Sequence, residues 1–167
     1  HVARLMLLRH AKAEWAEPGQ RDYDRVLSEE GQRECASVAQ QMVDKAIMPD
    51  AIICSEAVRA RETVDHMHPV IHFTSRMLFE KDLYATDAPG YLEIAAASGA
   101  TGDIMLVGHN PMMEDLAYGL AENGDETAVS GLNMGFRTCG LAILRFDNDI
   151  ASIGSQKGFL EAYIVPA

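Results

Sequence analysis

The chain has 167 residues, of which 48% are hydrophobic and 23% charged, a composition typical of a globular domain and unlike that of a disordered or repetitive chain. A chain of this length buries roughly 70% of its unfolded surface on folding, so we expect a single domain over residues 1–167. The net charge of −11 repels phosphate backbones and anionic lipids, which excludes nucleic acid and membranes as expected partners.

The sequence indicates a cytoplasmic protein. The apolar stretch at residues 5–8 ends at Arg9 and His10, too early for a signal peptide, and no apolar run reaches the roughly 18 residues of a membrane span. Cys35, Cys54 and Cys139 are an odd number without a C-x-x-C pair, which favours buried thiols in a reducing compartment. The chain starts with His1 instead of Met, and we leave His1 out of the candidate site.

The first third of the chain predicts two strand-helix pairs. Residues 3–8 form a short apolar run, typical of a buried strand. Ser28 then stands where a helix N-cap belongs, before apolar residues at helical spacing within residues 29–47. A second buried strand at residues 50–54 precedes a helical stretch at residues 59–68.

The pattern of alternating elements continues to the end of the chain. Asn110 is expected to cap a helix that has Pro111 at its first position. The other expected elements are strands at 70–79, 103–107, 140–146 and 159–165 and a helix at 88–97. Apolar strands alternating with helices predict an α/β fold, a three-layer α/β/α sandwich around a mainly parallel sheet. In such sheets, ligands bind beyond the carboxyl ends of the strands.

Polar residues follow three of the predicted strands where packing does not require them. Arg9 and His10 follow the first strand, Ser55 and Arg59 the second, and His109 the strand at 103–107. Two guanidinium groups and two imidazoles at one edge of a sheet suit a dianionic phosphoryl group, because arginine offers planar, paired donors. A neutral imidazole there can also act as a nucleophile.

Three motifs in this order resemble a known family. L-M-L-L-R-H-A, S-E-A-V-R-A-R-E-T and L-V-G-H-N-P are similar to the strand-end motifs of the histidine phosphatase superfamily, which has the phosphoglycerate-mutase-like fold. The segments D-Y-D-R-V-L-S-E-E-G and D-L-Y-A-T and the small size most resemble its SixA-type phosphohistidine phosphatase branch. Ala11 replaces the family's usual glycine, and Ala16 replaces an asparagine of the mutases, which counts against a mutase.

The resemblance implies a role for each matching residue. His10 is the implied nucleophile, and Arg9, Arg59 and His109 are implied to grip the phosphoryl oxygens. Asp82 falls where the family often supplies a carboxylic acid that protonates the leaving group.

Two other residues stay open as alternatives at the expected site. Glu80 is the alternative to Asp82 as the acid. Arg25 is expected in a loop beside the site, where it is a candidate to contact the substrate.

Other chemistries find less support in the sequence. His66, His68 and His72 form H-x-H-x3-H, which more often belongs to a helix end than to a metal site, so we expect neither metal nor cofactor. Cys54 and Arg59 have four intervening residues, one fewer than the loop of cysteine-dependent phosphatases. Nucleotide-binding and serine-hydrolase motifs do not occur.

The sequence therefore predicts a phosphatase with a phosphohistidine intermediate and a shallow site. Such a site suits phosphohistidine on another protein, such as a phosphotransfer domain. A small-molecule phosphomonoesterase and a catalytically silent phosphate-binding or interaction module are the alternatives.

Overall fold

A computed structural model describes residues 2–167, so His1 lies outside the described part. Seven strands form one sheet in the order β3-β2-β4-β1-β6-β7-β5. The strands are β1 (Ala3–Arg9), β2 (Ala51–Ser55), β3 (Arg76–Glu80), β4 (Ile104–Gly108), β5 (Ala121–Gly124), β6 (Leu141–Phe146) and β7 (Gly158–Ile164). The α-helices are α1 (Glu29–Asp44), α2 (Val58–Ile71), α3 (Ala88–Ala97), α4 (Met112–Leu120) and α5 (Glu126–Leu132).

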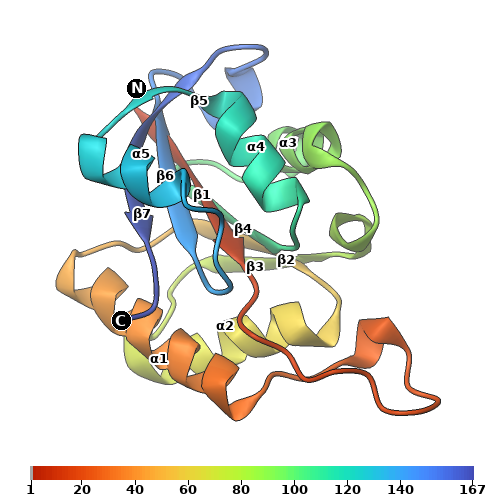
Figure 1. Cartoon of the computed structure of the whole chain (residues 1–167). Helices are drawn as coiled ribbons and strands as arrows, with labels where there is room; N and C mark the ends of the chain where they lie inside the picture. The colour runs from red at the N-terminus through yellow and green to blue at the C-terminus, as the bar shows by residue number, and fades with distance from the viewer. Residues whose placement is uncertain (1) are drawn as a thin grey trace.

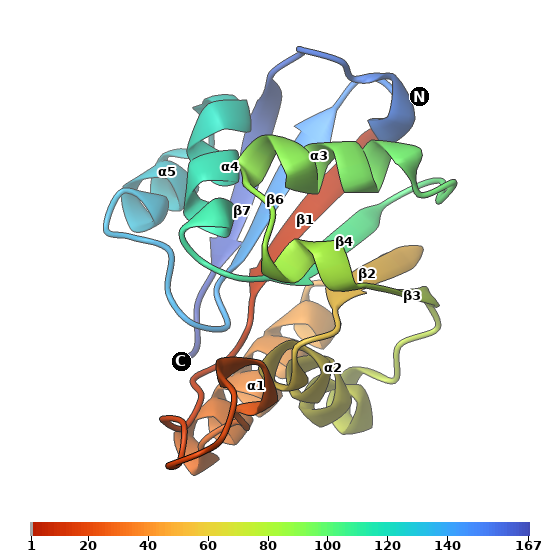
Figure 2. The same cartoon turned by 90° about the vertical axis from the view of Figure 1, so that its right-hand side faces the viewer.

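The helices cover both faces of the sheet, which confirms the predicted three-layer sandwich. The pair α1 and α2 lies on one face, and α3, α4 and α5 lie on the other (Figures 1 and 2). The mainly parallel character is also confirmed, because β1 pairs in parallel with β4, β4 with β2, and β2 with β3. Strand β6 is antiparallel to both β1 and β7.

Strand β1 joins two separate hydrophobic cores, because side chains of a strand alternate between its faces. Leu5 and Leu7 pack in the core under α3, α4 and α5, whereas Met6 and Leu8 pack in the core under α1 and α2. All four side chains are almost completely buried. The residues that follow β1 therefore start from a strand that is held on both faces.

Several predicted boundaries need correction. The helix predicted to start at Pro111 begins at Met112 with Pro111 as N-cap, while the side chain of Asn110 accepts a hydrogen bond from Glu114 N–H at 3.2 Å. The strand predicted at 70–79 is confined to β3, because α2 continues through Ile71. The elements β5 and α5 were not expected from the sequence, and α1 ends three residues earlier than predicted.

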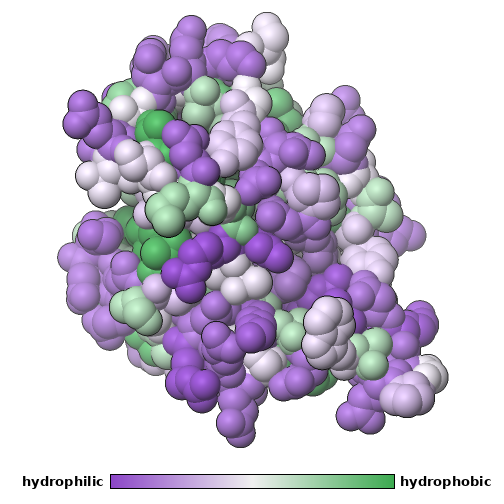
Figure 3. All heavy atoms as spheres, viewed as in Figure 1, coloured by the Kyte–Doolittle hydropathy of each residue, from purple (hydrophilic) through white to green (hydrophobic). Residues whose placement is uncertain are grey.

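The surface is largely polar. In the face shown in Figure 3, hydrophilic side chains dominate and apolar ones form small separate patches. No helix within residues 2–167 is long and apolar enough to cross a membrane. The segment between β1 and α1 extends away from the body of the molecule, at the lower right of Figure 1.

Candidate functional site

A pocket of about 430 Å³ lies at the carboxyl ends of β1 and β4. It brings together five of the residues singled out in the sequence: Arg9, His10, Arg25, Arg59 and His109. The other lining residues are Lys12, Ala13, Trp15, Asn110 and Thr138. The parallel strands explain this meeting, because their carboxyl ends reach the same edge of the sheet.

His10 is held as a neutral imidazole with one nitrogen available. Its Nδ1 lies 2.7 Å from Ala11 O, and because a carbonyl oxygen only accepts hydrogen bonds, Nδ1 carries the proton. Nε2 then keeps its lone pair and accepts a hydrogen bond from Arg59 Nε at 3.3 Å. Burial, with smaller effects of the cations around it, lowers the pKa of His10 to about 3. An unprotonated nitrogen at neutral pH is what a nucleophile needs.

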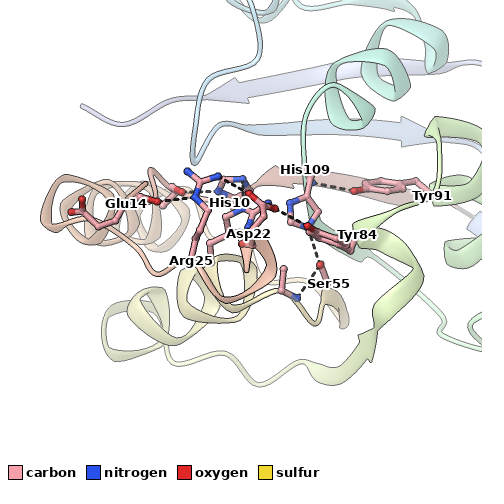
Figure 4. A network of polar contacts seen from close by, with 11 residues as sticks. His10, Glu14, Asp22, Arg25, Ser55, Tyr84, Tyr91 and His109 are labelled. Atoms are coloured by element: carbon pink, nitrogen blue, oxygen red, sulfur yellow. Dashed lines mark hydrogen bonds and ion pairs between the residues drawn. The ribbon is translucent and has the colours of Figure 1, made fainter. Parts of the chain in front are cut away.

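His109 faces His10, with their ring centroids 5.3 Å apart (Figure 4). Its position depends on Gly108, because a Cβ there would lie 2.6 Å from Tyr91 Oη, the atom that accepts the His109 N–H. On the ring, Nε2 lies 2.8 Å from Ser55 Oγ. Burial lowers the pKa of His109 to about 4, so this ring is also neutral at physiological pH.

The pocket contains buried donors that suit an anion. Arg9 Nη1 donates to Phe136 O at 2.7 Å, and burial lowers the pKa of Arg9 from its usual high value without neutralising the group. Within residues 2–167, Arg9 Nε and His109 Nδ1 are buried and have no hydrogen-bond partner. Buried polar atoms normally have partners, so these two atoms indicate a polar ligand, and Arg9 Nε, which can only donate, requires an acceptor on it.

Asp22 is a site residue that the sequence reasoning missed. Its carboxylate pairs with Arg59 Nη2 at 3.0 Å and Arg25 Nη1 at 3.1 Å, and accepts the Tyr84 hydroxyl at 2.7 Å. These hydrogen bonds, that from Tyr84 above all, lower the pKa of Asp22 to about 2. Asp22 lies in a short 3₁₀ turn, Asp22–Asp24, which has no hydrophobic periodicity. The only sequence feature that could have identified Asp22 as a site residue is therefore its place in the segment D-Y-D-R-V.

A buried carboxylate, that of Glu34, joins two walls of the pocket. Glu34 on α1 accepts the Lys12 N–H at 2.8 Å through Oε1 and the Thr138 hydroxyl at 2.8 Å through Oε2. Ala11 lies in the core under α1 and α2, and its N–H donates to Thr63 Oγ1 at 2.9 Å. Neither Glu34 nor Thr63 carries a recognisable sequence signal.

The expected acids, Asp82 and Glu80, do not lie in this pocket. Asp82 lines a separate depression beside α3, and its N–H is capped by Glu80 Oε1 at 3.2 Å. The 3₁₀ turn Lys81–Tyr84 directs Tyr84 to the site instead, where its ring lies 5.5 Å from that of His109. With three residues per turn, Asp82 and Tyr84 face different sides.

The remaining candidate groups have structural surroundings. His68 and His72 lie with ring centroids 6.0 Å apart, and His68 Nδ1 accepts the Phe73 N–H. Across residues 2–167, no three His, Cys, Asp or Glu side chains are grouped so that they could hold a metal ion. Cys54 is buried, which raises the pKa of its thiol and keeps it protonated.

Comparison with known proteins places these features in one family. Residues 5–80 match the sequence profile of the histidine phosphatase superfamily (branch 1). The crystal structure of a SixA phosphohistidine phosphatase candidate from Agrobacterium tumefaciens is similar, with 34% identity, a TM-score of 0.81 and coverage of 98% of this chain and 99% of that one.

Two curated relatives are uncharacterized proteins. One, from Mycobacterium tuberculosis, is 32% identical over 95% of this chain and 99% of its own length. The other is a chloroplastic protein of Arabidopsis thaliana that is 30% identical. That match covers 85% of this chain and 66% of the Arabidopsis protein.

Proposed function

The chain belongs to the histidine phosphatase superfamily, in its SixA-type branch, and from this premise we propose that it hydrolyses phosphohistidine on another protein. As a member of this family it is a phosphatase. The substrate class, the roles of the site residues and independence from a cofactor are the proposed parts.

The proposed reaction has two steps at His10. In the first, the Nε2 lone pair attacks phosphorus, the bond from phosphorus to the substrate imidazole breaks, and the electron pair leaves with that imidazole. The leaving ring keeps a proton on its second nitrogen and departs as neutral histidine. In the second step, water attacks the phosphoryl group on His10, the bond from phosphorus to Nε2 breaks, and Nε2 regains its electron pair. Inorganic phosphate leaves as the dihydrogen phosphate monoanion, which keeps both protons of the water.

One observation carries the choice of a phosphohistidine substrate. The pocket lining within residues 2–167 contains four cationic side chains, of Arg9, Lys12, Arg25 and Arg59, and no carboxylic acid. Asp22, the carboxylate paired with Arg25 and Arg59 of the lining, has a pKa of about 2 and is ionised at neutral pH, so it has no proton to donate. An alkoxide leaving group needs a positioned acid, whereas an imidazole does not.

Three donors are proposed to bind the phosphoryl oxygens: Arg9 Nε, Arg59 Nε and His109 Nδ1. The third depends on which nitrogen of His109 carries the proton. Ser55 Oγ accepts the Ala57 N–H at 3.2 Å, and within residues 2–167 its own proton has no hydrogen-bond acceptor other than His109 Nε2, 2.8 Å away, so we infer that it donates there. His109 then carries its ring proton on Nδ1, as a donor to the phosphoryl group needs.

A trapping experiment tests the proposal. The chain is mixed briefly with a peptide carrying ³²P-phosphohistidine, quenched in alkali, which preserves phosphohistidine, and analysed for label on residue 10. We expect label on the wild type and none on His10→Ala. Turnover is then compared between this peptide and an alkyl phosphate of similar charge. A faster reaction with the alkyl phosphate would favour a small-molecule phosphomonoesterase, and absence of turnover with both would indicate a silent binding module.

A further inference from the structure

Trp15, the only tryptophan of the chain, stands at the rim of the pocket with 86% of its surface exposed. The indole ring makes a cation–π contact with Arg25, whose Cζ lies 5.6 Å from the ring centroid. Arg25 is itself fixed, because its Nε donates to Glu14 O at 2.8 Å and its Nη1 pairs with Asp22. An exposed aromatic ring held in place beside a site is typical of an anchor for a binding partner.

Trp15 lies between two depressions of different character. The first is the cation-lined pocket around His10. The second has a volume of about 540 Å³ and is lined by Glu14, Trp15, Glu17, Pro18, Gly19, Gln20 and Val26. Among these residues the charged side chains are both carboxylates, so the electrostatic character changes from positive to negative across the indole.

The size of the two depressions favours a polypeptide as occupant. A single phosphorylated side chain with its imidazole reaches only the first depression, where the phosphoryl dianion meets the cations. A ligand that also covers Trp15 and enters the second depression must continue beyond that side chain, as a polypeptide does. The carboxylates of Glu14 and Glu17 complement a basic residue on that continuation.

We propose that Trp15, Glu14 and Glu17 form a docking surface for the polypeptide segment that carries the phosphorylated side chain, with the segment packed on the indole and a lysine or arginine facing the two carboxylates. This inference rests on the proposed function. A series of contacts connects Trp15 to the nucleophile. Trp15 packs on Arg25, which pairs with Asp22. Asp22 in turn pairs with Arg59, which donates to His10. A segment seated on Trp15 is therefore close to the nucleophile.

Quenching of Trp15 fluorescence tests the docking surface directly. The His10→Ala variant is used so that ligand is not consumed, and its quenching by acrylamide is measured with inorganic phosphate or with a phosphohistidine peptide of 12 residues that contains two lysines. We expect saturating peptide to lower the quenching constant at least about 2-fold, because the indole becomes buried, and phosphate to leave it nearly unchanged. Equal quenching constants with peptide and phosphate would overturn the proposal. The same peptide with glutamates for lysines is expected to bind about 10-fold more weakly, and equal binding would refute the role of Glu14 and Glu17.

Kinetics provide a second, independent test. For Trp15→Ala, kcat/KM is expected to fall at least about 10-fold more with the lysine peptide than with phosphoramidate, a small substrate with the same type of P–N bond. Met134→Ala is the matched control, because Met134 is 90% exposed and lines neither depression. Equal losses on both substrates would overturn the docking role. A wild type that hydrolyses neither substrate would instead refute the proposed function, while the fluorescence result would still decide the docking surface.

Discussion

Replacing Ser55 with alanine removes one hydroxyl group that has two partners in the site. Ser55 is completely buried and lies between Ala57 N–H and His109 Nε2, at 3.2 and 2.8 Å. Leaving buried groups without partners costs about 1–3 kcal/mol, which lowers the melting temperature of a domain of this size by roughly 2–12 °C. The proton of His109 is then free to move from Nδ1 to Nε2, and loss of one preorganised donor reduces kcat by roughly 10²-fold.

The assay separates these two effects. Thermal unfolding gives the change in stability, single-turnover hydrolysis of a phosphohistidine peptide gives the rate, and ¹⁵N chemical shifts of His109 report which nitrogen is protonated. Ser98→Ala is the matched control, since Ser98 also makes two hydrogen bonds, to Ala95 O and Ala100 N–H, but lies at the end of α3 outside the pocket. A destabilised Ser55→Ala with an unchanged rate and an Nδ1-protonated His109 would refute the role of Ser55 in setting the tautomer.

Four further predictions follow from the site. His10→Ala is expected to reduce hydrolysis to background while far-UV circular dichroism stays unchanged; substantial residual turnover would contradict the nucleophile. Turnover by the wild type is expected to survive EDTA, because arginines bind the phosphoryl charge, and restoration of activity by added zinc would contradict this. Asp22→Asn is expected to lower kcat/KM roughly 10-fold or more, because the variant loses the ion pair with Arg59. Asp82 lies outside the pocket, so the kcat/KM of Asp82→Asn should stay within about 2-fold of wild type with both the peptide and the alkyl phosphate. The pKa of His109 is about 4 in the folded state and 6.5 in the unfolded state, so the unfolded state takes up a proton first as the pH falls. The free energy of unfolding should therefore decline between about pH 6.5 and pH 4. Urea unfolding is expected to show a smaller decline for His109→Gln.

The sequence was sufficient to predict the parts of the site that follow strands. Arg9, His10 and His109 come directly after apolar runs, and a parallel sheet brings such positions together without knowledge of any side-chain contact. Asp22 lies in a loop, and its partners Arg59 and Tyr84 are 37 and 62 residues away, so no local pattern shows that these groups meet.

The errors of the sequence-based prediction also have physical causes. The resemblance of D-L-Y to the family pattern suggested Asp82 as the acid, whereas the 3₁₀ turn directs Tyr84 to the pocket, because a shift of one residue changes the direction of a side chain in such a turn. Strand β5, with the sequence A-E-N-G, has neither apolar alternation nor β-branched residues and forms through pairing with β7. Tertiary contacts decide such short segments, and no local propensity reveals them.

The central position of β1 has a consequence for how the site opens. Its backbone amides pair with β4 and β6, and its side chains enter both cores, so Leu5 to Leu8 should exchange their amide hydrogens only through global unfolding. The segment that carries Asp22 is attached mainly by side-chain contacts, and opening it locally leaves the strand pairing intact. We therefore expect His10 and Asp22 to belong to units of different hydrogen-exchange rate that are in contact at Arg59. The Asp22 side of the site should then open repeatedly while the strand that carries His10 stays folded.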